Sequence, residues 1–410
     1  MNTINKVVKK ELCTGCGTCT GICPYGAIRM VKDEKRGIYF PKIDEKKCRH
    51  CGLCLKACPG ASVNFKQLNL SIFGKEPENK LIGNYLQCYT GYSTNERLRH
   101  DCSSGGIVTQ LLIYLLEKNI IDGALVTKMK KDNPLEPEPF IAKTKKEIIS
   151  GRGSKYCPVP VNVGLKGILS SKKNEKIAVV GLPCHIQGIR KAEEVLPELK
   201  KRIILHIGLF CNHTPNFSAT KVLLEKFKIR PEKILKLDYR GEGWPGKMKI
   251  RTKNKDFLIS DYWSIIGSPK FTAKRCKLCT DATAELADIS CGDAWLPEFL
   301  KDRTGTSIII IRSPISRQIL EFMKRENRLN FKKTVTYKVI LSQRGVLDYK
   351  KIEVPIRIRI RKLFSKNNPF YNIKFLNPNL RDISRILKSK MLSHARKFLV
   401  RINLTHRNFP

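Results

Sequence analysis

The chain of 410 residues is long enough for two or three domains and carries 78 Lys and Arg against 36 Asp and Glu, a formal net charge of +42. Its 16 cysteines and a polar start without the apolar core of a secretory signal exclude a disulfide framework and favour metal or redox sites in a cytoplasmic protein. The longest apolar runs are strand-sized, which excludes a membrane-spanning helix. The charge calls for anionic partners: nucleic acid, acidic lipid, acidic protein or phosphate-rich cofactors.

Two cysteine runs near the start of the chain, CTGCGTCTGICP and CRHCGLCLKACP, repeat the spacing C-x2-C-x2-C-x3-C-P. Three thiolates on one loop hold three corners of a four-iron cubane, and in two-cluster ferredoxins the fourth cysteine of each run ligates the other cluster. A zinc site needs only two C-x2-C pairs. The repeat therefore predicts two [4Fe-4S] clusters. Their ligands would be Cys13, Cys16, Cys19 and Cys58 for one cluster and Cys48, Cys51, Cys54 and Cys23 for the other.

After a stretch rich in helix breakers, the segment SSGG at residues 103–106 precedes an apolar helical pattern from Ile107 to Leu116. Gly123 to Thr127 then resembles a short buried strand. Small hydroxyls and glycines at a helix start leave backbone N–H groups open to an anion at the positive end of the helix dipole. A cofactor phosphate and an ordinary serine N-cap both explain this pattern.

Two cysteines follow the ends of predicted strands. Strand Ile177–Val180 precedes Cys184, and strand Ile203–Leu209 precedes Cys211. Ligands of α/β sheets bind beyond the carboxyl ends of the strands, so both thiolates face one crevice if the strands are parallel neighbours. A lone cysteine is usually inert in a core. Further along, however, the C-x2-C pair of RCKLCTD offers only half of a four-ligand set, and the two strand-end cysteines are candidates for the other half.

The segment AELADISCGDAW, residues 284–295, reads as the end of a helix followed by a strand and a tight turn at Gly292 and Asp293. Asp293 is a candidate for orienting a cofactor ring or a ribose hydroxyl. The alternative is that this carboxylate only organises its own turn.

Together, the motifs SSGGIVTQLLIYLL, GSKY, GLPCHIQGIRK, IGLFC and CKLCTDATAELADISCGD resemble the family that contains the beta subunits of coenzyme F420-reducing hydrogenase and F420-linked dehydrogenases. That family also includes ferredoxin-dependent reductases such as 7-hydroxymethyl chlorophyll a reductase. The resemblance covers residues 86–300 and implies a bound FAD beside one [4Fe-4S] cluster. It implies the cluster ligands Cys184, Cys211, Cys276 and Cys279 and the flavin-binding residues Ser104, Gly105, Gly106, Lys155 and Tyr156, to which we add Ser103 and Asp293 as cofactor-binding candidates.

Four cysteines fall outside these ligand sets. Cys102, Cys157 and Cys291 lie inside matching motifs, where they either compete for iron or pack, and Cys88 is assigned to packing. Cys291 is the nearer candidate to complete the C-x2-C pair, so its exclusion is a definite prediction.

The expected architecture is mixed, α+β and α/β. A small N-terminal ferredoxin domain with two [4Fe-4S] clusters, residues 1–68, is followed by a linker, residues 69–84. An α/β flavin-binding catalytic domain with FAD and a third [4Fe-4S] cluster spans residues 85–300. A basic, partly helical C-terminal extension covers residues 301–410.

These parts predict an iron–sulfur flavoprotein oxidoreductase that couples one-electron transfer, from a ferredoxin or another redox subunit, to hydride transfer at FAD. Coenzyme F420 is the expected hydride partner. Two alternatives stay open: a ferredoxin-dependent reductase of another organic substrate, and an electron-transfer subunit of a larger complex without its own substrate site. The absence of an interleaved aromatic and basic motif argues against nucleic acid as the partner.

The C-terminal extension has few acids and many Lys and Arg. IRIRIRK, Ile356 to Lys362, alternates like an exposed strand. Downstream, apolar residues at helical spacing predict a basic amphipathic helix: Ile383, Ile386, Leu387, Met391, Ala395, Phe398, Leu399 and Ile402. Such a helix fits an anionic inner membrane face or an acidic partner such as a ferredoxin, and packing on its own domain is an equal alternative.

Overall fold

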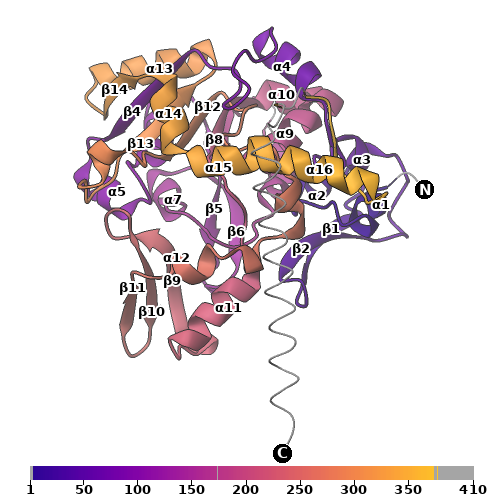
Figure 1. Cartoon of the computed structure of the whole chain (residues 1–410), viewed down its shortest axis with the longest axis horizontal. Coiled ribbons are helices and arrows are strands. Elements are labelled where there is room, and N and C mark those ends of the chain that lie inside the picture. Colours follow the sequence, from indigo (N-terminus) through magenta and orange to yellow (C-terminus); the bar gives the residue numbers. More distant parts are fainter. Residues whose placement is uncertain (1–2, 173, 374–375, 377–410) are drawn as a thin grey trace, which may run out of the picture.

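A large mixed sheet forms the centre of the computed structural model, which describes residues 3–172, 174–373 and 376 (Figure 1). Its eight strands follow the order β14-β4-β13-β12-β8-β7-β5-β6. Strands β12, β8, β7 and β5 run parallel, and antiparallel strands extend the sheet at both edges. The strands are β1 Ile28–Asp33, β2 Ile38–Ile43, β3 Ser62–Val63, β4 Gln87–Ser93, β5 Gly123–Met129, β6 Pro137–Ala142, β7 Ile177–Gly181, β8 Ile203–Leu209, β9 Ile234–Gly241, β10 Lys247–Thr252, β11 Asp256–Ile259, β12 Ile289–Asp293, β13 Ser307–Ile311, β14 Leu329–Thr334 and β15 Phe370–Tyr371.

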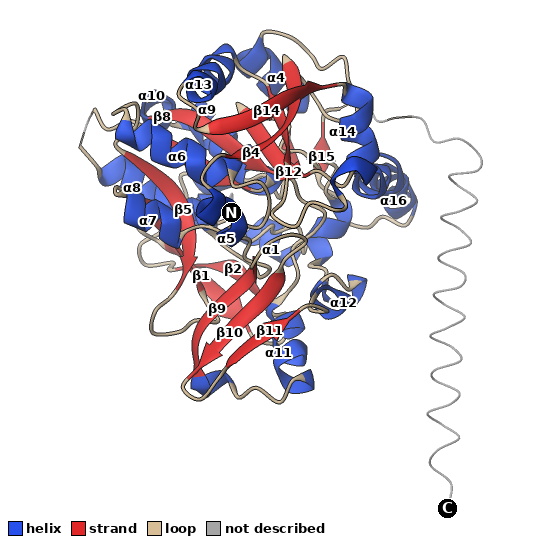
Figure 2. Cartoon of the chain, turned by 90° about the vertical axis from the view of Figure 1, so that its left-hand side faces the viewer, coloured by secondary structure: helices blue, strands red, loops and turns tan. Residues whose placement is uncertain are grey.

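Helices cover the sheet and join it to smaller sheets (Figure 2). The α-helices are α1 Asn5–Lys9, α2 Thr18–Gly21, α3 Leu53–Lys56, α4 Phe65–Phe73, α5 Glu96–Asp101, α6 Ile107–Glu117, α7 Lys145–Ser150, α8 Leu165–Ser170, α9 Pro183–Val195, α10 Pro197–Arg202, α11 Phe217–Lys226, α12 Trp263–Ile266, α13 Pro314–Arg325, α14 Thr336–Ser342, α15 Arg344–Asp348 and α16 Val354–Leu363. Short 3-10 turns are η1 Val161–Gly164, η2 Pro231–Lys233, η3 Pro269–Phe271, η4 Lys274–Leu278 and η5 Pro297–Phe299, and η6 Tyr349–Glu353 is a π-helix.

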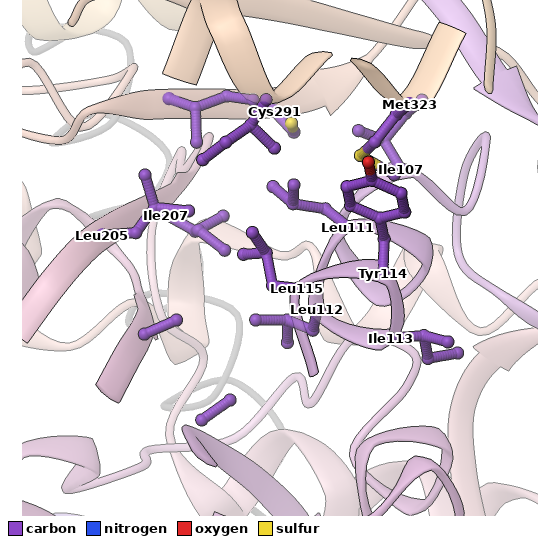
Figure 3. Close-up of a cluster of buried hydrophobic side chains, with 14 of the residues drawn as sticks. Ile107, Leu111, Leu112, Ile113, Tyr114, Leu115, Leu205, Ile207, Cys291 and Met323 are labelled. Atoms are coloured by element: carbon purple, nitrogen blue, oxygen red, sulfur yellow. The ribbon is translucent and has the colours of Figure 1, made fainter. Parts of the chain in front are cut away.

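Alternate residues of each parallel strand point to opposite faces of the sheet, and both sets of residues are buried. In β5, Ala124 and Val126 pack in the cluster that contains α6 and α13. Leu125, between them, packs with residues of α8, α9 and α10 on the other face. Figure 3 shows Leu111 and Leu115 of α6 lying close to the sheet residues of the first face. Each such fully buried aliphatic side chain stabilises the fold by about 1.5–3 kcal/mol.

The structure confirms the strands expected before Cys184 and Cys211. Strand β8 has the predicted bounds, β7 extends one residue further than predicted, and the two pair in parallel with Val180 opposite Ile207. Helix α6 begins at Ile107, as the apolar spacing predicted. Cys184 and Cys211 therefore follow the ends of neighbouring parallel strands.

The N-terminal module, which consists of residues 3–68, packs against helix α9. Lys191 of α9 donates from Nζ to the carbonyl oxygens of Cys58, at 2.9 Å, and Ser62, at 2.6 Å. Asn162 bonds through its backbone N–H to the Cys16 carbonyl and through its side-chain amide to Thr18. Gly188 leaves no room for a side chain, because a Cβ there would collide with Thr18 Oγ1. The first turn of α9, which carries Cys184, is thereby held beside the module.

Several expectations differ from the structure. The alternating IRIRIRK segment is not a strand but part of helix α16, in which Val354 and Ile358 share one face and pack with Ile4 and Val7 of the N-terminal module. This tertiary contact favours the 3.6-residue period over the alternation. Residues 284–288 form no helix, and Gly292 and Asp293 belong to β12 instead of a turn.

The expected domain borders also look different in three dimensions. The sheet continues past residue 300, because β13 and β14 pair with β4. Helix α4 crosses the border expected at residue 68, and Ile82 and Asn84 of the expected linker are buried. The β15 strand pairs with β3 and ties the C-terminal region to the N-terminal module. The predicted amphipathic helix from Ile383 to Ile402 lies outside the described residues. None of the helices that the structure describes is long and apolar enough to cross a bilayer.

The close contact at Gly188 gives a stability prediction. Gly188→Ala should lower the free energy of unfolding by about 1–3 kcal/mol, because the added methyl group overpacks the contact with Thr18. Gly345→Ala is the matched control, since Gly345 lies in helix α15 and a Cβ there meets nothing within 4 Å. This control should be neutral or raise the free energy by up to about 1 kcal/mol. Denaturant unfolding of both variants measures the difference, and equal stabilities would contradict the proposed contact.

Candidate metal centres and cofactor cavity

Four cysteines converge where α9 begins. Cys184 lies in the first turn of α9, Cys211 follows β8, Cys276 lies in η4 and Cys279 directly follows it. Burial raises the pKa of the Cys184 thiol well above its ordinary value, and neighbouring thiols, including those of the other three cysteines, raise it further. We call Cys184, Cys211, Cys276 and Cys279 the central set.

The eight cysteines of the N-terminal module gather at two places, and the spacing C-x2-C-x2-C-x3-C-P assigns them to two sets of four by the crossed pattern. We call Cys13, Cys16, Cys19 and Cys58 the inner set and Cys23, Cys48, Cys51 and Cys54 the outer set. Burial raises the pKa of Cys13 to about 12, with Cys58 and Cys16 as the thiols that add to the shift. The four cysteines of the outer set line a single hollow at the surface, where Cys51 is exposed.

The three sets lie in series. Among the thiols that raise the pKa of Cys184 after burial itself, Cys16 of the inner set contributes most. The same inner set adjoins the outer set, because Cys54 is among the thiols that raise the pKa of Cys19 once burial has done so. The sets therefore run from the surface, through the module, to the start of α9.

Sulfur spacing distinguishes two metal chemistries. Four thiolates about 2.3 Å from a tetrahedral zinc ion lie roughly 4 Å apart, whereas a four-iron cubane holds its ligands further apart. Within the described residues, Glu45, Cys48 and His50 form the one group of at least three candidate ligands whose ligand atoms all lie within 4.8 Å of one another. Among the described residues, none of the three cysteine sets forms such a closely spaced group of ligand atoms.

Buried polar atoms around the central set lack protein partners. Within the described part of the chain, no hydrogen-bond partner is found for Arg275 Nε and Nη1, Thr280 Oγ1 or His213 Nε2. The ammonium of Lys350, with 1% of the residue exposed, lies near three thiols of the set, which raise its pKa against the opposing effect of burial. Donors and a cation around four thiols suit an anionic iron–sulfur cluster with sulfur acceptors.

The remaining four cysteines stand apart from these sets. Cys291 packs in the core between α6 and the sheet (Figure 3), and burial alone raises its pKa to about 12. Cys102 bonds to Thr109, and Cys157 packs in the cluster that contains Tyr239. Cys88 is buried in β4. All four are core residues in the structure.

A cavity of about 660 Å³ opens between β5, α7, the loop after α7 and the β9–β10 hairpin. Its lining is strongly basic. The cations are Lys128, Lys130, Lys131, Lys146, Arg152, Lys155, Lys236, Arg240, Lys247, Lys249 and Arg251, and the acids are Asp101, Asp238 and Glu242. Several of these cations form ion pairs, but Lys131, Lys146 and Lys247 have no acidic partner among the described residues. The cavity thus retains unpaired positive charge for an anionic ligand.

Lys155 belongs to this lining, but its ammonium is already bound. Its Nζ donates to the carbonyl oxygens of Gly151, Arg152 and Gly153 at 2.6–3.0 Å. Burial lowers its pKa to about 8, and Asp238 opposes that shift. Lys155 therefore contributes a titratable charge to the cavity wall and fixes the loop that carries it.

The SSGG segment supports the cavity from behind and does not line it. Ser103 Oγ donates to the Arg240 carbonyl and accepts from the Ser154 N–H. Gly105 donates its N–H to Ser307 Oγ, and a Cβ at this position would lie 2.6 Å from the Gly91 carbonyl oxygen. Ser104 donates to the carbonyl oxygen of Thr306. The N-cap of α6 is Gly106, whose φ of +73° favours glycine.

The remaining candidates form a polar network beside the cavity. Asp293 receives two hydrogen bonds of 2.8 Å from the Arg240 guanidinium and one of 2.9 Å from Trp244 Nε1. Arg240 also donates to the Tyr156 hydroxyl, and the Tyr156 ring packs against Trp263. The Asp293 carboxylate therefore holds Arg240 in place on the cavity wall.

Sequence reasoning missed Arg275, Lys350 and Arg240. Arg275 directly precedes a cysteine of the C-x2-C pair, and only that position hinted at a role. Lys350 and Arg240 belong to no motif and reach their sites through the fold.

Three family models match the chain. The 4Fe-4S dicluster domain matches residues 12–61, and the N-terminal and C-terminal parts of the coenzyme F420 hydrogenase/dehydrogenase beta subunit match residues 88–166 and 174–336. Fold and cysteine sets thus define an iron–sulfur oxidoreductase of mixed α/β fold. The chain belongs to the family of coenzyme F420 hydrogenase/dehydrogenase beta subunits, as its motifs predicted.

The chain is similar in sequence to several named proteins over much of its length. It is 30% identical to the coenzyme F420 hydrogenase subunit beta of Methanothermobacter thermautotrophicus over 59% of its own length and 82% of the relative. It is 26% identical to the F420-dependent formate dehydrogenase subunit beta of Methanocaldococcus jannaschii over 67% of its length and 67% of the relative. A chain of the F420-reducing [NiFe] hydrogenase complex from Methanosarcina barkeri superimposes with a TM-score of 0.58 and 25% identity, covering 72% of this chain and 98% of that one.

Iron content tests the central set. Cys184→Ser should remove about four of twelve irons, because a cubane with one ligand lost is no longer held. The matched control is Cys291→Ser, which should retain about twelve irons, since Cys291 packs in the core. Iron and acid-labile sulfide analysis of anaerobically prepared proteins provides the measurement. Iron loss from the control with full loading of Cys184→Ser would reverse the assignment.

Proposed function

We propose that this chain is an iron–sulfur flavoprotein that couples one-electron transfer on its ferredoxin side to hydride transfer at FAD, with coenzyme F420 as the hydride partner. The observation that carries the proposal is the serial arrangement of outer, inner and central cysteine sets. A basic cavity large enough for a cofactor lies between β5, α7 and the β9–β10 hairpin.

The proposed groups supply complementary chemistry, because [4Fe-4S] clusters carry single electrons whereas a flavin exchanges a hydride and also releases electrons singly. The chain's own residues hold these groups. The inner and outer sets would each bind one cluster, and the central set would bind the third. Lys191, Asn162 and Gly188 keep the inner set beside the central set.

The outer set supports a protein partner at the surface. Cys51 is exposed, and Arg49 and Lys56 beside it are exposed cations. An acidic electron carrier such as a ferredoxin suits this charge. Relatives are subunits of multi-subunit hydrogenase complexes, so a neighbouring redox subunit is the alternative partner at the same surface.

The cavity supports a cofactor that carries negative charge. Lys131, Lys146 and Lys247 offer cations without acidic partners among the described residues, and the Asp293 carboxylate orients Arg240. Phosphate groups are bound by such Lys and Arg clusters. The candidates Ser103, Ser104, Gly105 and Gly106 would act by placing the cavity wall.

Two other functions use the same parts. A ferredoxin-dependent reductase of another organic substrate would need only a different ligand in the cavity. An electron-transfer subunit without its own substrate site is favoured by the similarity to a chain of a hydrogenase complex. The second alternative predicts flavin and iron but no reaction with any hydride donor.

Anaerobic purification followed by flavin and iron analysis tests the proposal. We expect FAD and about twelve irons per chain, from three four-iron clusters. Mixing with reduced coenzyme F420 should then bleach the flavin absorbance. Protein without flavin would overturn the flavoprotein proposal. Protein with flavin and full iron content that does not react with reduced coenzyme F420 would favour the alternatives above.

The pKa of Lys155 gives a pH prediction. Lys155 is charged below about pH 8 and neutral above it, so the cavity loses one positive charge as the pH rises through this value. The affinity for FAD should therefore fall by up to about tenfold per pH unit above about pH 8. Lys155→Met should bind more weakly below pH 8 and lose this dependence. Fluorescence titration of flavin-depleted protein with FAD at pH 7 and pH 9 checks both, and a pH-independent affinity of the unaltered protein would contradict the role of Lys155.

A further inference from the structure

Arg275 extends from the central set to the inner set. Its backbone lies in η4 directly before Cys276. Its Nη2 donates to the Tyr371 hydroxyl at 2.8 Å and to the carbonyl oxygen of Pro59, the residue after Cys58, at 3.4 Å. The guanidinium therefore lies where the two sets adjoin.

This guanidinium is buried without a carboxylate. Only 4% of Arg275 is exposed, and no acidic group pairs with it among the described residues. Its Nε and Nη1 are buried donors without an acceptor in the described protein. Buried arginines are normally paired or fully hydrogen-bonded, so two unused donors point to an acceptor that the polypeptide does not provide.

Thiols of both cysteine sets interact electrostatically with this guanidinium. Burial raises the pKa of Cys13 in the inner set, and Arg275 opposes that shift. Burial lowers the pKa of Arg275 itself, but Tyr371, Cys279 and Cys276 outweigh that effect. Lys350 is a useful comparison, because the thiols that act on it all belong to the central set.

We infer that Arg275 sets the reduction potentials of the inner and central clusters together, by donating its two unpaired N–H groups to sulfur acceptors at their junction and by placing one buried positive charge between them. Hydrogen bonds to the sulfurs and local net charge control the potential of such clusters. A cation attracts the added electron of the reduced state, so Arg275 makes both clusters easier to reduce. This inference rests on the ligand sets of the proposed function.

Redox titration of the iron-loaded full chain, followed by electron paramagnetic resonance, tests the inference. In Arg275→Gln, the ratio of reduced to oxidised cluster at a fixed ambient potential should fall about tenfold for two of the three clusters, a shift of about 59 mV for one electron. In Lys350→Met, only one cluster should shift. Arg275→Lys retains the charge but loses the forked donors, so its shift should be smaller and in the same direction.

Arg202→Gln is the matched control. Arg202 is similarly buried, but its guanidinium bonds to the carbonyl oxygens of Ile168 and Ser171, away from the cysteine sets. All three potentials should remain unchanged in this variant. Arg275→Gln with full iron content and unchanged potentials, or with one shifted cluster, would overturn the inference. Should Arg275→Gln fail to load iron, unchanged potentials in a fully loaded Arg275→Lys would overturn it as well.

Iron analysis separates this inference from the proposed function. About eight irons in the unaltered protein, with no further loss in Cys184→Ser, would show that the central set holds no cluster and would overturn the proposed function. About twelve irons with potentials that ignore Arg275 would remove only the role of Arg275.

Discussion

The contact between helix α9 and the N-terminal module is the constraint on which the arrangement of the cysteine sets depends. Gly188 lets α9 approach Thr18 closely, and Lys191 binds the carbonyl oxygens of Cys58 and Ser62. The same helix carries Cys184 in its first turn. One rigid element thus fixes the distance between inner and central sets, which matters because electron transfer depends on separation. Strand β15 adds a second tie between the module and the C-terminal region.

The buried positive charge of the protein is also related to the cysteine sets. A formal charge of +42 is extreme for a protein of this size, but part of it lies inside the molecule. Arg275 and Lys350 are buried near cysteine sets, where anionic clusters would neutralise them. Other buried cations are paired within the protein, as in the network of Arg190, Glu193, His206 and Asp288. Buried positive charge that has no acidic partner among the described residues therefore marks the places where an anionic group is expected.

Sequence reasoning worked where a pattern depends on few local residues. The bounds of β8 and the start of α6 both follow from apolar spacing. It failed where distant contacts decide: the alternation in IRIRIRK gave way to helix α16, because Val354 and Ile358 pack on the N-terminal module. The role of Asp293 was open in the sequence, since its partner Arg240 lies on another sheet. Arg275 lies in the C-x2-C motif, but only the structure shows that two of its N–H donors have no acceptor among the described residues.

The central claim is that three cysteine sets, in series, hold three iron–sulfur clusters. Diffraction from crystals of anaerobically prepared protein, recorded on both sides of the iron and zinc absorption edges, tests it most directly. The account predicts three separate four-iron peaks, the innermost bounded by Cys184, Cys211, Cys276 and Cys279 and with Arg275 between it and the next. Zinc at the central set, or iron beside Cys291 in its place, would contradict the account.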